Sequence, residues 1–262
     1  MTITVNQIKI GGVVTNTSLP IIETANSAIA DDARVEGFFT PKPSLVTNEG
    51  GGSLDGLISA MSNRKTGSAL ELTEAVTTAQ PQINLDGGPT TSRPALQFFT
   101  SGDDKLTANA AVDVSGDFFR VAIFKSGATT SNEYLLYTGT SGNRWMFHLG
   151  TGNKVYMRVG ASGTEANVSV AFIPDEWNLA IGTWNAATET AGISINGGAF
   201  VYDTQVGAVV DETGVIVSGG KLDQTLIHDF AYGTGDLSTV GNADLLAYIL
   251  TYARAVGVTN VS

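Results

Sequence analysis

The stretch EWNLAIGTWNAATETAGISINGGAF, from Glu176 to Phe200, decides the fold class of this chain. In its first half, Trp177, Leu179 and Ile181 fall on one side of an extended chain, and the residues between them fall on the other. After the polar break NAATET, a second alternating run ends at Asn196-Gly197. Asn-Gly beside period-two apolar spacing indicates a β-hairpin, because both residues tolerate the positive φ that a type I′ turn requires. The stretch therefore predicts a protein built from sheets.

Further alternating segments extend this interpretation along the chain. The clearest runs from Lys154 to Val159, where every second residue is apolar. Similar runs, separated by Gly, Asn and Ser turns, span residues 118–124, 134–137, 144–149, 168–172, 215–218 and 225–231. One helix is expected near the end, with Asn242 as N-cap and Gly257 where it stops. We expect an all-β sandwich with Trp177 as a buried anchor.

The composition limits the classes of function. A chain of 262 residues, 42% of them hydrophobic, can bury a full core and most simply forms one main domain. The absence of cysteine excludes disulfides, thiolate metal sites and a cysteine nucleophile. The net charge of −11 opposes binding to nucleic acid and to anionic membranes. We expect neither membrane insertion nor a signal peptide, because no long apolar run and no basic leader pattern is present.

The first 33 residues differ from the rest of the sequence. A short β-like beginning around Ile3 and Val5 precedes small and polar residues with weak periodicity between positions 24 and 33. Such a segment is too poor in apolar side chains to build a core of its own. We therefore expect an N-terminal arm or attachment segment at 1–33 and a sandwich domain at 34–262.

With its strands in order, the chain resembles the laminin-G-like branch of the concanavalin A-like lectin/glucanase superfamily, in the form found in bacteriophage and marine bacterial proteins. The matching segments, which span about residues 35–257, are LDGLISAM at 54–61, PALQFFTSGDDKL at 94–106, Phe118 to Lys125, Trp177 to Trp184, Ser194 to Gly198 and Leu237-Ser238 before the final helix. Met61 stands where the family has a tryptophan, and His228 or Asp229 replaces its usual glutamate. The resemblance implies a two-sheet antiparallel jelly-roll sandwich of the concanavalin A type, with one C-terminal helix and the arm.

The residues that glucanases of this superfamily use for catalysis have no counterpart in the sequence. Those enzymes carry carboxylates spaced E-x-D-x-x-E on one strand. The segment Glu71-Leu72-Thr73-Glu74 has neither that spacing nor a strongly β context. The two histidines, His148 and His228, accompany no G-x-S-x-G elbow, and their separation makes a poor metal site. We expect His148 in the core or at a rim, His228 partly buried and bonded to a neighbour, and no enzymatic activity.

A carbohydrate site is a candidate around residues 132–156. Aromatic faces hold the C–H patches of sugars, while Asn and Asp bond the hydroxyls. The candidate residues are Tyr134, Trp145, Asn153 and Tyr156. The alternative is that Trp145 and Tyr137 fill the core. Tyr156 is the expected exposed aromatic, because it shares a strand face with Lys154 and Arg158.

Asp103 and Asp104 are weak candidates for a calcium site. Some laminin-G-like domains bind such an ion at a loop rim, so the resemblance implies the option. Paired acidic residues after Gly102 also commonly shape a turn, where Asp bonds to nearby backbone. We expect no other cofactor.

The resemblance favours a non-enzymatic virion structural protein of a bacteriophage, namely a fibre, spike or decoration subunit on the particle surface. The expected partners are other virion proteins bound through the arm, sister copies in a homo-oligomer, of which a trimer is favoured, and host surface polysaccharide. Synthesis would take place in the host cytoplasm. The alternative class is a free carbohydrate-binding module or a degenerate glycosidase. A stable trimer that ignores glycans would favour the structural class, and a monomer with a sugar preference would favour the module.

Overall fold

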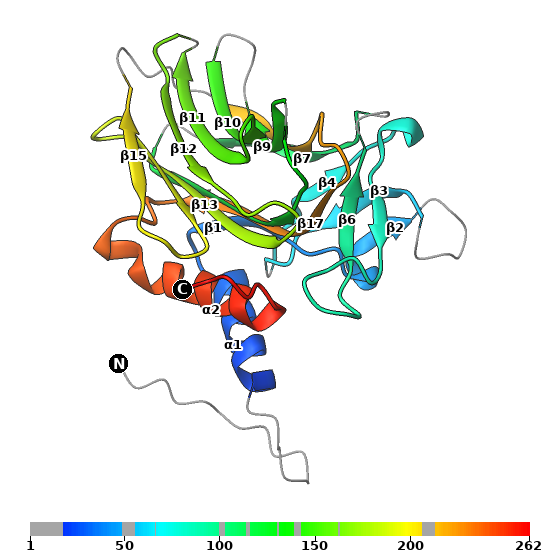
Figure 1. Ribbon diagram of the computed structural model, residues 1–262. Coiled ribbons are helices and arrows are strands. Elements are labelled where there is room, and N and C mark those ends of the chain that lie inside the picture. The colour runs from blue at the N-terminus through cyan, green and yellow to red at the C-terminus, as the bar shows by residue number, and fades with distance from the viewer. Residues whose placement is uncertain are drawn as a thin grey trace.

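The computed structural model describes residues 18–48, 56–65, 67–99, 103–113, 116–129, 131–138, 143–161, 163–205 and 213–262. They form two stacked antiparallel sheets, and two helices lie together against the outer side of one sheet (Figure 1). The predicted two-sheet jelly-roll sandwich with a C-terminal helix is confirmed. Neither helix in the described part of the chain is long and apolar enough to cross a membrane.

The sheets divide the strands as follows. Sheet A contains β1 (Val35–Phe39), β5 (Gln82–Asn84), β6 (Ala95–Phe98), β8 (Phe118–Lys125), β13 (Trp177–Asn185), β14 (Thr190–Ile195), β15 (Val201–Thr204) and β17 (Thr225–Thr234). Sheet B contains β2 (Val46–Asn48), β3 (Ile58–Ser62), β4 (Glu71–Thr73), β7 (Lys105–Asp113), β9 (Glu133–Thr138), β10 (Asn143–Gly150), β11 (Lys154–Ala161), β12 (Ala166–Ala171) and β16 (Thr213–Gly219). The helices are α1 (Ser18–Asp31) and α2 (Ala243–Val256), with short 3-10 turns η1 (Pro43–Leu45), η2 (Thr77–Ala79) and η4 (Val240–Asn242).

The strand order places the middle of the chain at one side of the sandwich. Sheet A runs β15-β14-β13-β8-β17-β6-β5, and β1 also pairs with β17. Sheet B runs β12-β11-β10-β9-β16-β7-β4-β3-β2. The strands β9, β10, β11 and β12 are therefore successive neighbours in both sequence and space, and their outer face forms one continuous surface.

The central strands of sheet A are covered on both faces. Along β8, Phe118, Ala122 and Phe124 belong to the core between the sheets, whereas Phe119 and Val121 belong to a second core beneath the helices. Every residue of β8 except the last is accordingly buried. Within the described residues both helices pack on sheet A, so the outer face of sheet B carries no helix (Figure 1).

The stretch from Glu176 to Phe200 forms both the predicted hairpin and the predicted Asn-Gly turn, but this turn does not connect the two strands of the hairpin. β13 and β14 pair antiparallel across residues 186–189. Asn196 and Gly197 have φ values of 52° and 76°, and the Gly198 amide donates to the Ile195 carbonyl at 2.9 Å. These values define a type I′ turn. The turn follows β14 and leads toward β15, and the Asn196 side chain ties it to β13 by accepting the Leu179 amide at 2.8 Å.

The expectation that Trp177 is a buried anchor is wrong. Trp177 begins β13 and is only half-buried, at the margin of the core beneath the helices. Trp184, at the other end of β13, is 0% exposed and points into the core between the sheets. There it meets Trp145, also 0% exposed, edge to face with ring centres 6.3 Å apart. Both faces of β13 are apolar, so sequence periodicity could not show which side holds the larger core.

The described part of the expected arm is a packed helix, which corrects the expectation that it adds little to a core. Ala25, Ile29 and Ala30 of α1 are buried in the core beneath the helices, together with residues of α2 and sheet A. The small side chains of Ala25 and Ala30 let the helices approach closely, and Ala is the best helix former. Just after α1, Arg34 pairs with Asp244 of α2 at 3.0 Å. The β-like beginning around Ile3 and Val5 lies outside the described residues.

The C-terminal helix has the predicted ends. α2 follows Asn242 and stops at Gly257, whose φ of 110° suits glycine. The Asn242 side chain does not cap the helix, however. It donates to the Asp236 carbonyl at 2.8 Å and accepts from the Arg34 guanidinium at 2.9 Å.

Asp236 fixes the loop between β17 and α2 to sheet A. Its carboxylate accepts hydrogen bonds from the Thr183 hydroxyl at 2.7 Å, the Asn185 amide at 3.2 Å and the Ser238 backbone amide at 2.9 Å. Burial by itself raises the pKa of Asp236, but the hydrogen bonds from Ser238, Thr183 and Asn185 together outweigh burial, and the pKa lies below the usual 3.8.

Replacing this carboxylate should therefore weaken the fold in a pH-dependent way. Asp236→Asn is expected to lower the free energy of unfolding by about 1–3 kcal/mol near neutral pH. Because the pKa is lower in the folded state, the carboxylate stabilises the fold above the unfolded pKa, and this contribution is lost as the pH falls through the folded pKa. Urea unfolding at about pH 7 and about pH 2.5 should show a smaller acid-induced loss in the variant. Equal acid-induced losses would contradict this role.

Candidate functional site

Four rings lie side by side on the outer face of sheet B. Strand register places Tyr134 of β9 opposite His148 of β10, and His148 opposite Tyr156 of β11. The Tyr156 ring stacks on the His148 ring with centres 5.0 Å apart and planes inclined by 9°. Tyr134 lies 6.1 Å from His148 on the other side, and Tyr137 lies 5.1 Å from Tyr134. We call Tyr134, Tyr137, His148 and Tyr156 the aromatic row.

A β-bulge in β9 brings two of these rings to one face. Tyr134 and Tyr137 are three residues apart, so a regular strand would point them to opposite faces. The register between β9 and β10 shifts at Phe147 and His148, and the bulge turns both Leu135 and Leu136 into the core. Bulges re-aim side chains in this way. The arrangement depends on pairing between strands and not on spacing within one strand.

Charged groups flank the aromatic row. The Arg158 guanidinium lies 5.4 Å from the centre of the Tyr156 ring, and the Lys221 ammonium lies 5.9 Å from that of Tyr134. Both distances are within the range of a cation–π contact. Asp103 accepts the Lys221 backbone amide at 3.1 Å beside the row. Burial, then the nearby Asp103 and Tyr134, raise the pKa of Tyr137, so its phenol stays protonated and can donate.

Exposure separates the residues of the row by role. Tyr134, Tyr137 and Tyr156 are half-buried, so part of each ring or hydroxyl meets solvent. His148 is 0% exposed because the tyrosine rings enclose it. The imidazole therefore fixes the spacing of the tyrosines, which offer the accessible surface. The tyrosines provide apolar ring faces and phenol hydroxyls. Arg158 and Lys221 add two cations, and Asp103 adds a carboxylate.

The sequence candidates divide between this surface and other places. Tyr134 and Tyr156 belong to the aromatic row. Trp145 does not, because its position on β10 alternates with His148 and its indole points into the core between the sheets. The prediction of Trp145 as a sugar-binding residue is thus wrong, and its alternative, a core residue, is correct. Asn153 has a φ of 57° in the β10–β11 turn and accepts the Thr129 amide at 3.1 Å, so its side chain shapes the turn.

Sequence reasoning did not place His148 in a binding surface, and it weighed Tyr137 as a core residue, whereas the structure leaves Tyr137 half-buried on the outer face. The signal for His148 was present, since the turn at residues 150–154 pairs β10 with β11 and sets His148 opposite Tyr156. Tyr137 needed the bulge, which the sequence did not reveal. His228, expected to be partly buried and bonded to a neighbour, is 1% exposed and lies 2.7 Å from the Pro94 carbonyl.

The two calcium candidates point to different places. Asp104 is buried in its own turn and accepts the Phe99 amide at 2.9 Å, and burial raises the pKa of its carboxyl group. Asp103 instead binds the Lys221 amide. Among the residues that the structure describes, no group of three or more His, Cys, Asp or Glu side chains could hold a metal ion. Each carboxylate of the pair thus accepts a backbone amide, Asp104 within its own turn and Asp103 from the loop that follows β16.

Comparison with known proteins identifies the fold. No protein-family model and no curated protein matches the chain. The Trypanosoma rangeli sialidase is similar in structure, with a TM-score of 0.52 and 10% identity over 92% of this chain and 39% of that one. The binding domain of botulinum neurotoxin DC, solved with rat synaptotagmin II, gives 0.50 and 11% over 82% and 52%. The botulinum neurotoxin type G receptor binding domain gives 0.52 and 11% over 82% and 51%.

This chain spans about half, or less, of the length of these structures. At such low identity the likeness shows the fold alone. The chain is a two-sheet jelly-roll β-sandwich.

Proposed function

We propose that this chain is a non-enzymatic, lectin-like domain that binds a glycan on the aromatic row. The observation that carries the proposal is the gathering of Tyr134, Tyr137 and Tyr156 on a sheet face that no helix covers in the described part. Their rings offer apolar faces to the C–H groups of a sugar, and their hydroxyls can bond sugar hydroxyls. Arg158 and Lys221 flank the row and can bond further oxygens.

The same surface supports binding over catalysis. Glycoside hydrolysis ordinarily uses two carboxyl groups on either side of the scissile bond. Beside the row, Asp103 is engaged by the Lys221 amide, and a single carboxylate cannot serve as both acid and nucleophile. His148, enclosed between two rings, has no open face for proton transfer to a bound substrate. Within the part that the structure describes, rings and two cations are gathered here instead of a pair of carboxylates, which suits recognition.

We further propose that the domain is displayed on a bacteriophage particle, as part of a fibre, spike or decoration subunit. The support is the order of the sequence motifs that resemble phage laminin-G-like domains. In this proposal residues 1–17 contact other virion proteins or sister copies in a trimer, and host polysaccharide is the glycan. Since α1 is packed on the sandwich, the segment before it would start from a fixed point.

Electron microscopy of particles carrying or lacking this chain tests the display. Missing density at one surface site in particles without the chain would support it, and unchanged particles would overturn it. Light scattering on the purified protein tests the oligomer, with a trimer expected. A monomer that binds one sugar and leaves particles unchanged would favour a free carbohydrate-binding module.

Loss of the ring that stacks on His148 tests the glycan site. Tyr156→Ala should weaken binding of the best glycan from an array by about tenfold or more, because truncating an aromatic residue that anchors a ligand commonly costs over 1 kcal/mol. Isothermal titration would measure the affinity. Tyr202→Ala is the matched control, since Tyr202 lies on β15 of sheet A and is 52% exposed. Equal losses in both variants, or no glycan bound by the parent protein, would reject the proposal.

A further inference from the structure

A second polar surface lies beside β17, and no residue of the aromatic row lines it. A hollow of about 500 Å³ opens between the segment after β1 and the loop before β6. Hydroxyls line it from Thr40, Thr90 and Ser92, and cations from Lys42 and Arg93. Apart from two prolines and His228, its lining residues carry only hydroxyl or cationic side chains. Such a lining suits a hydrophilic ligand.

The floor of the hollow is a buried histidine. His228 is 1% exposed, and its Nδ1 lies 2.7 Å from the Pro94 carbonyl oxygen. A carbonyl oxygen only accepts, so Nδ1 carries a proton. Nε2 lies 3.3 Å from the Asp229 carboxylate. The ring is therefore held at Nδ1, while Nε2 has no hydrogen-bond partner among the described residues and only lies near the Asp229 carboxylate.

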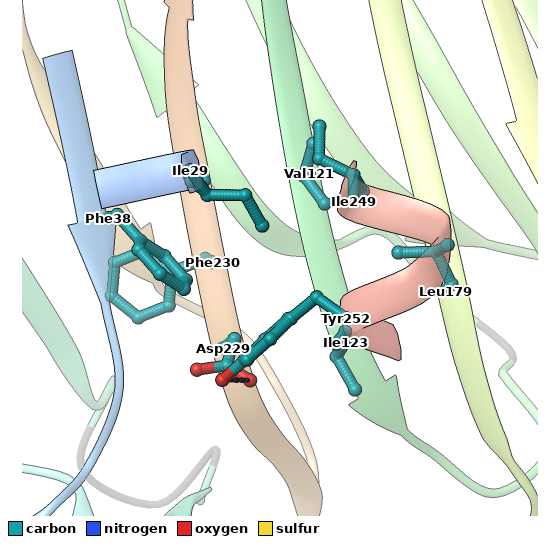
Figure 2. Close-up of a pocket in the computed structure, with 10 residues that line it drawn as sticks. Ile29, Phe38, Val121, Ile123, Leu179, Asp229, Phe230, Ile249 and Tyr252 are labelled. Atoms are coloured by element: carbon teal, nitrogen blue, oxygen red, sulfur yellow. Dashed lines mark hydrogen bonds between the residues drawn. The ribbon is translucent and has the colours of Figure 1, made fainter. Parts of the chain in front are cut away.

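The carboxylate of Asp229 is used on the far side of the sheet. It accepts the Thr40 hydroxyl at 2.5 Å and the Tyr252 hydroxyl at 3.1 Å. Figure 2 shows Asp229 and Tyr252 joined in a small cavity between sheet A and the helices, where Ile29, Phe38 and Ile249 are close by. Asp229 lines that small cavity and does not line the hollow.

The loop that supplies Arg93 is fixed in shape. The Gly88 amide donates to the Arg93 carbonyl at 2.8 Å, and the Arg93 amide donates to the Thr90 carbonyl at 3.1 Å. Ser92 has a φ of 70°, a conformation that a non-glycine residue keeps only where its surroundings enforce it. A Cβ at Gly257, just after α2, would come within 2.4 Å of Thr90, so the loop packs directly on the end of that helix.

The two cations of the hollow have no anionic partner in the described residues. Neither Lys42 nor Arg93 takes part in any ion pair there, although the chain carries a net charge of −11. Arg presents a planar fork that matches a carboxylate or sulfate group, and Lys adds a point charge. The volume is that of a small-molecule pocket and exceeds the needs of a bare inorganic anion.

We infer that this hollow binds an acidic sugar unit, whose carboxylate or sulfate lies between Lys42 and Arg93 and whose ring hydroxyls meet Thr90 and Ser92. The inference goes beyond the glycan site on the aromatic row and does not depend on it. It assigns an anionic specificity to a surface on sheet A that is separate from the row on sheet B.

The two histidines of the chain report the two sites separately. His228 lies in the hollow and His148 lies in the aromatic row, so NMR of the imidazole signals, assigned from their contacts with Pro94 and Tyr156, distinguishes them. Galacturonate, glucuronate and glucose 6-sulfate are titrated beside neutral galactose and glucose. We expect the acidic sugars to shift the His228 signal with a Kd on the order of 1 mM, and the neutral sugars to leave it unchanged.

Charge-removing variants locate the binding groups. Arg93→Gln and Lys42→Gln should each weaken the acidic sugar by about fivefold or more. Lys154→Gln is the matched control, since Lys154 is an exposed residue of β11 on sheet B, and it should leave the affinity unchanged. Added salt should weaken binding, because the charges remain partly open to solvent.

Three results would overturn the inference. The first is no His228 shift with any acidic sugar, and the second is a shift at His148 alone. The third is inorganic phosphate binding as tightly as the acidic sugars, which would mean a simple anion site. A failure here leaves the Tyr156→Ala test of the aromatic row unaffected, since that test is read on the other sheet.

Discussion

Trp145→Ala should lower the free energy of unfolding by about 3–5 kcal/mol, because it empties the centre of the core between the sheets. Trp145 is 0% exposed. Its ring centre lies 5.5 Å from that of Phe118 and 6.3 Å from that of Trp184. These neighbours sit on two strands of the opposite sheet, so they cannot collapse into the space without moving sheet A.

Two variants control for the size and chemistry of the change. Trp177→Ala removes the same side chain from a half-buried position and should cost about 1–2 kcal/mol. Trp145→Phe keeps most of the volume, and the indole Nε1 has no hydrogen-bond partner in the described residues, so its loss should be smaller than that of Trp145→Ala. Urea unfolding measures all three. A cost for Trp145→Ala no larger than that of Trp177→Ala would show that the indole faces solvent.

Arg120→Met should lower the free energy of unfolding by about 2–4 kcal/mol, although it removes a buried charge. Arg120 is 1% exposed and extends from β8 across the core. It donates to the Leu136 carbonyl at 3.0 Å, to the Thr138 hydroxyl at 2.8 Å and to the Trp145 carbonyl. Burial lowers the pKa of Arg120 to about 9, which leaves the group charged at neutral pH.

Two effects oppose each other in this variant. Removing the cation relieves its desolvation penalty, which favours the variant. Removing three charge-assisted hydrogen bonds leaves oxygens of β9 and β10 without that donor inside the core, at about 1–3 kcal/mol for each buried group. We expect the second effect to win, because methionine cannot donate to any of them. A variant more stable than the parent would mean that desolvation dominates.

Arg120→Lys separates the charge from the geometry. Lysine keeps the positive charge but has no planar fork, so it cannot reach both strands in the same way. We expect it to be destabilised as well. If Arg120→Lys is as stable as the parent protein, the charge alone suffices and the fork is not required.

Local patterns in the sequence predicted β8 to β14, β16 and β17 correctly, but not β15 or most strands before β8. Lys154 to Val159 alternates clearly because β11 has one face in the core and one in solvent. Such a strand reveals itself by spacing alone. β13 does not, since helices cover its second face, and this is why Trp177 was favoured over Trp184. α1 was missed because its buried residues are mostly alanines, which give weak apolar periodicity.

The candidate site depended on contacts between strands, which spacing within a strand cannot show. Tyr134 and Tyr156 were found as aromatics near turns, but Trp145 was included with them, although it lies on the opposite face of β10. The β9 bulge and the β10–β11 register decide which rings meet. The hollow at Arg93 combines segments about 50 and 135 residues away in the chain, so no single stretch of sequence indicates it.

On β9, β10 and β11, the positions that stabilise the fold differ from the positions that can contact a ligand. Side chains that hold the sheets together and side chains that meet solvent occupy interleaved positions on the same strands. Substitutions at the solvent positions can therefore change ligand preference while the interior stays intact. The loop at Arg93 tolerates fewer substitutions, because it packs on the end of α2. A substitution that changes the shape of the loop would also disturb the packing at that end of the helix.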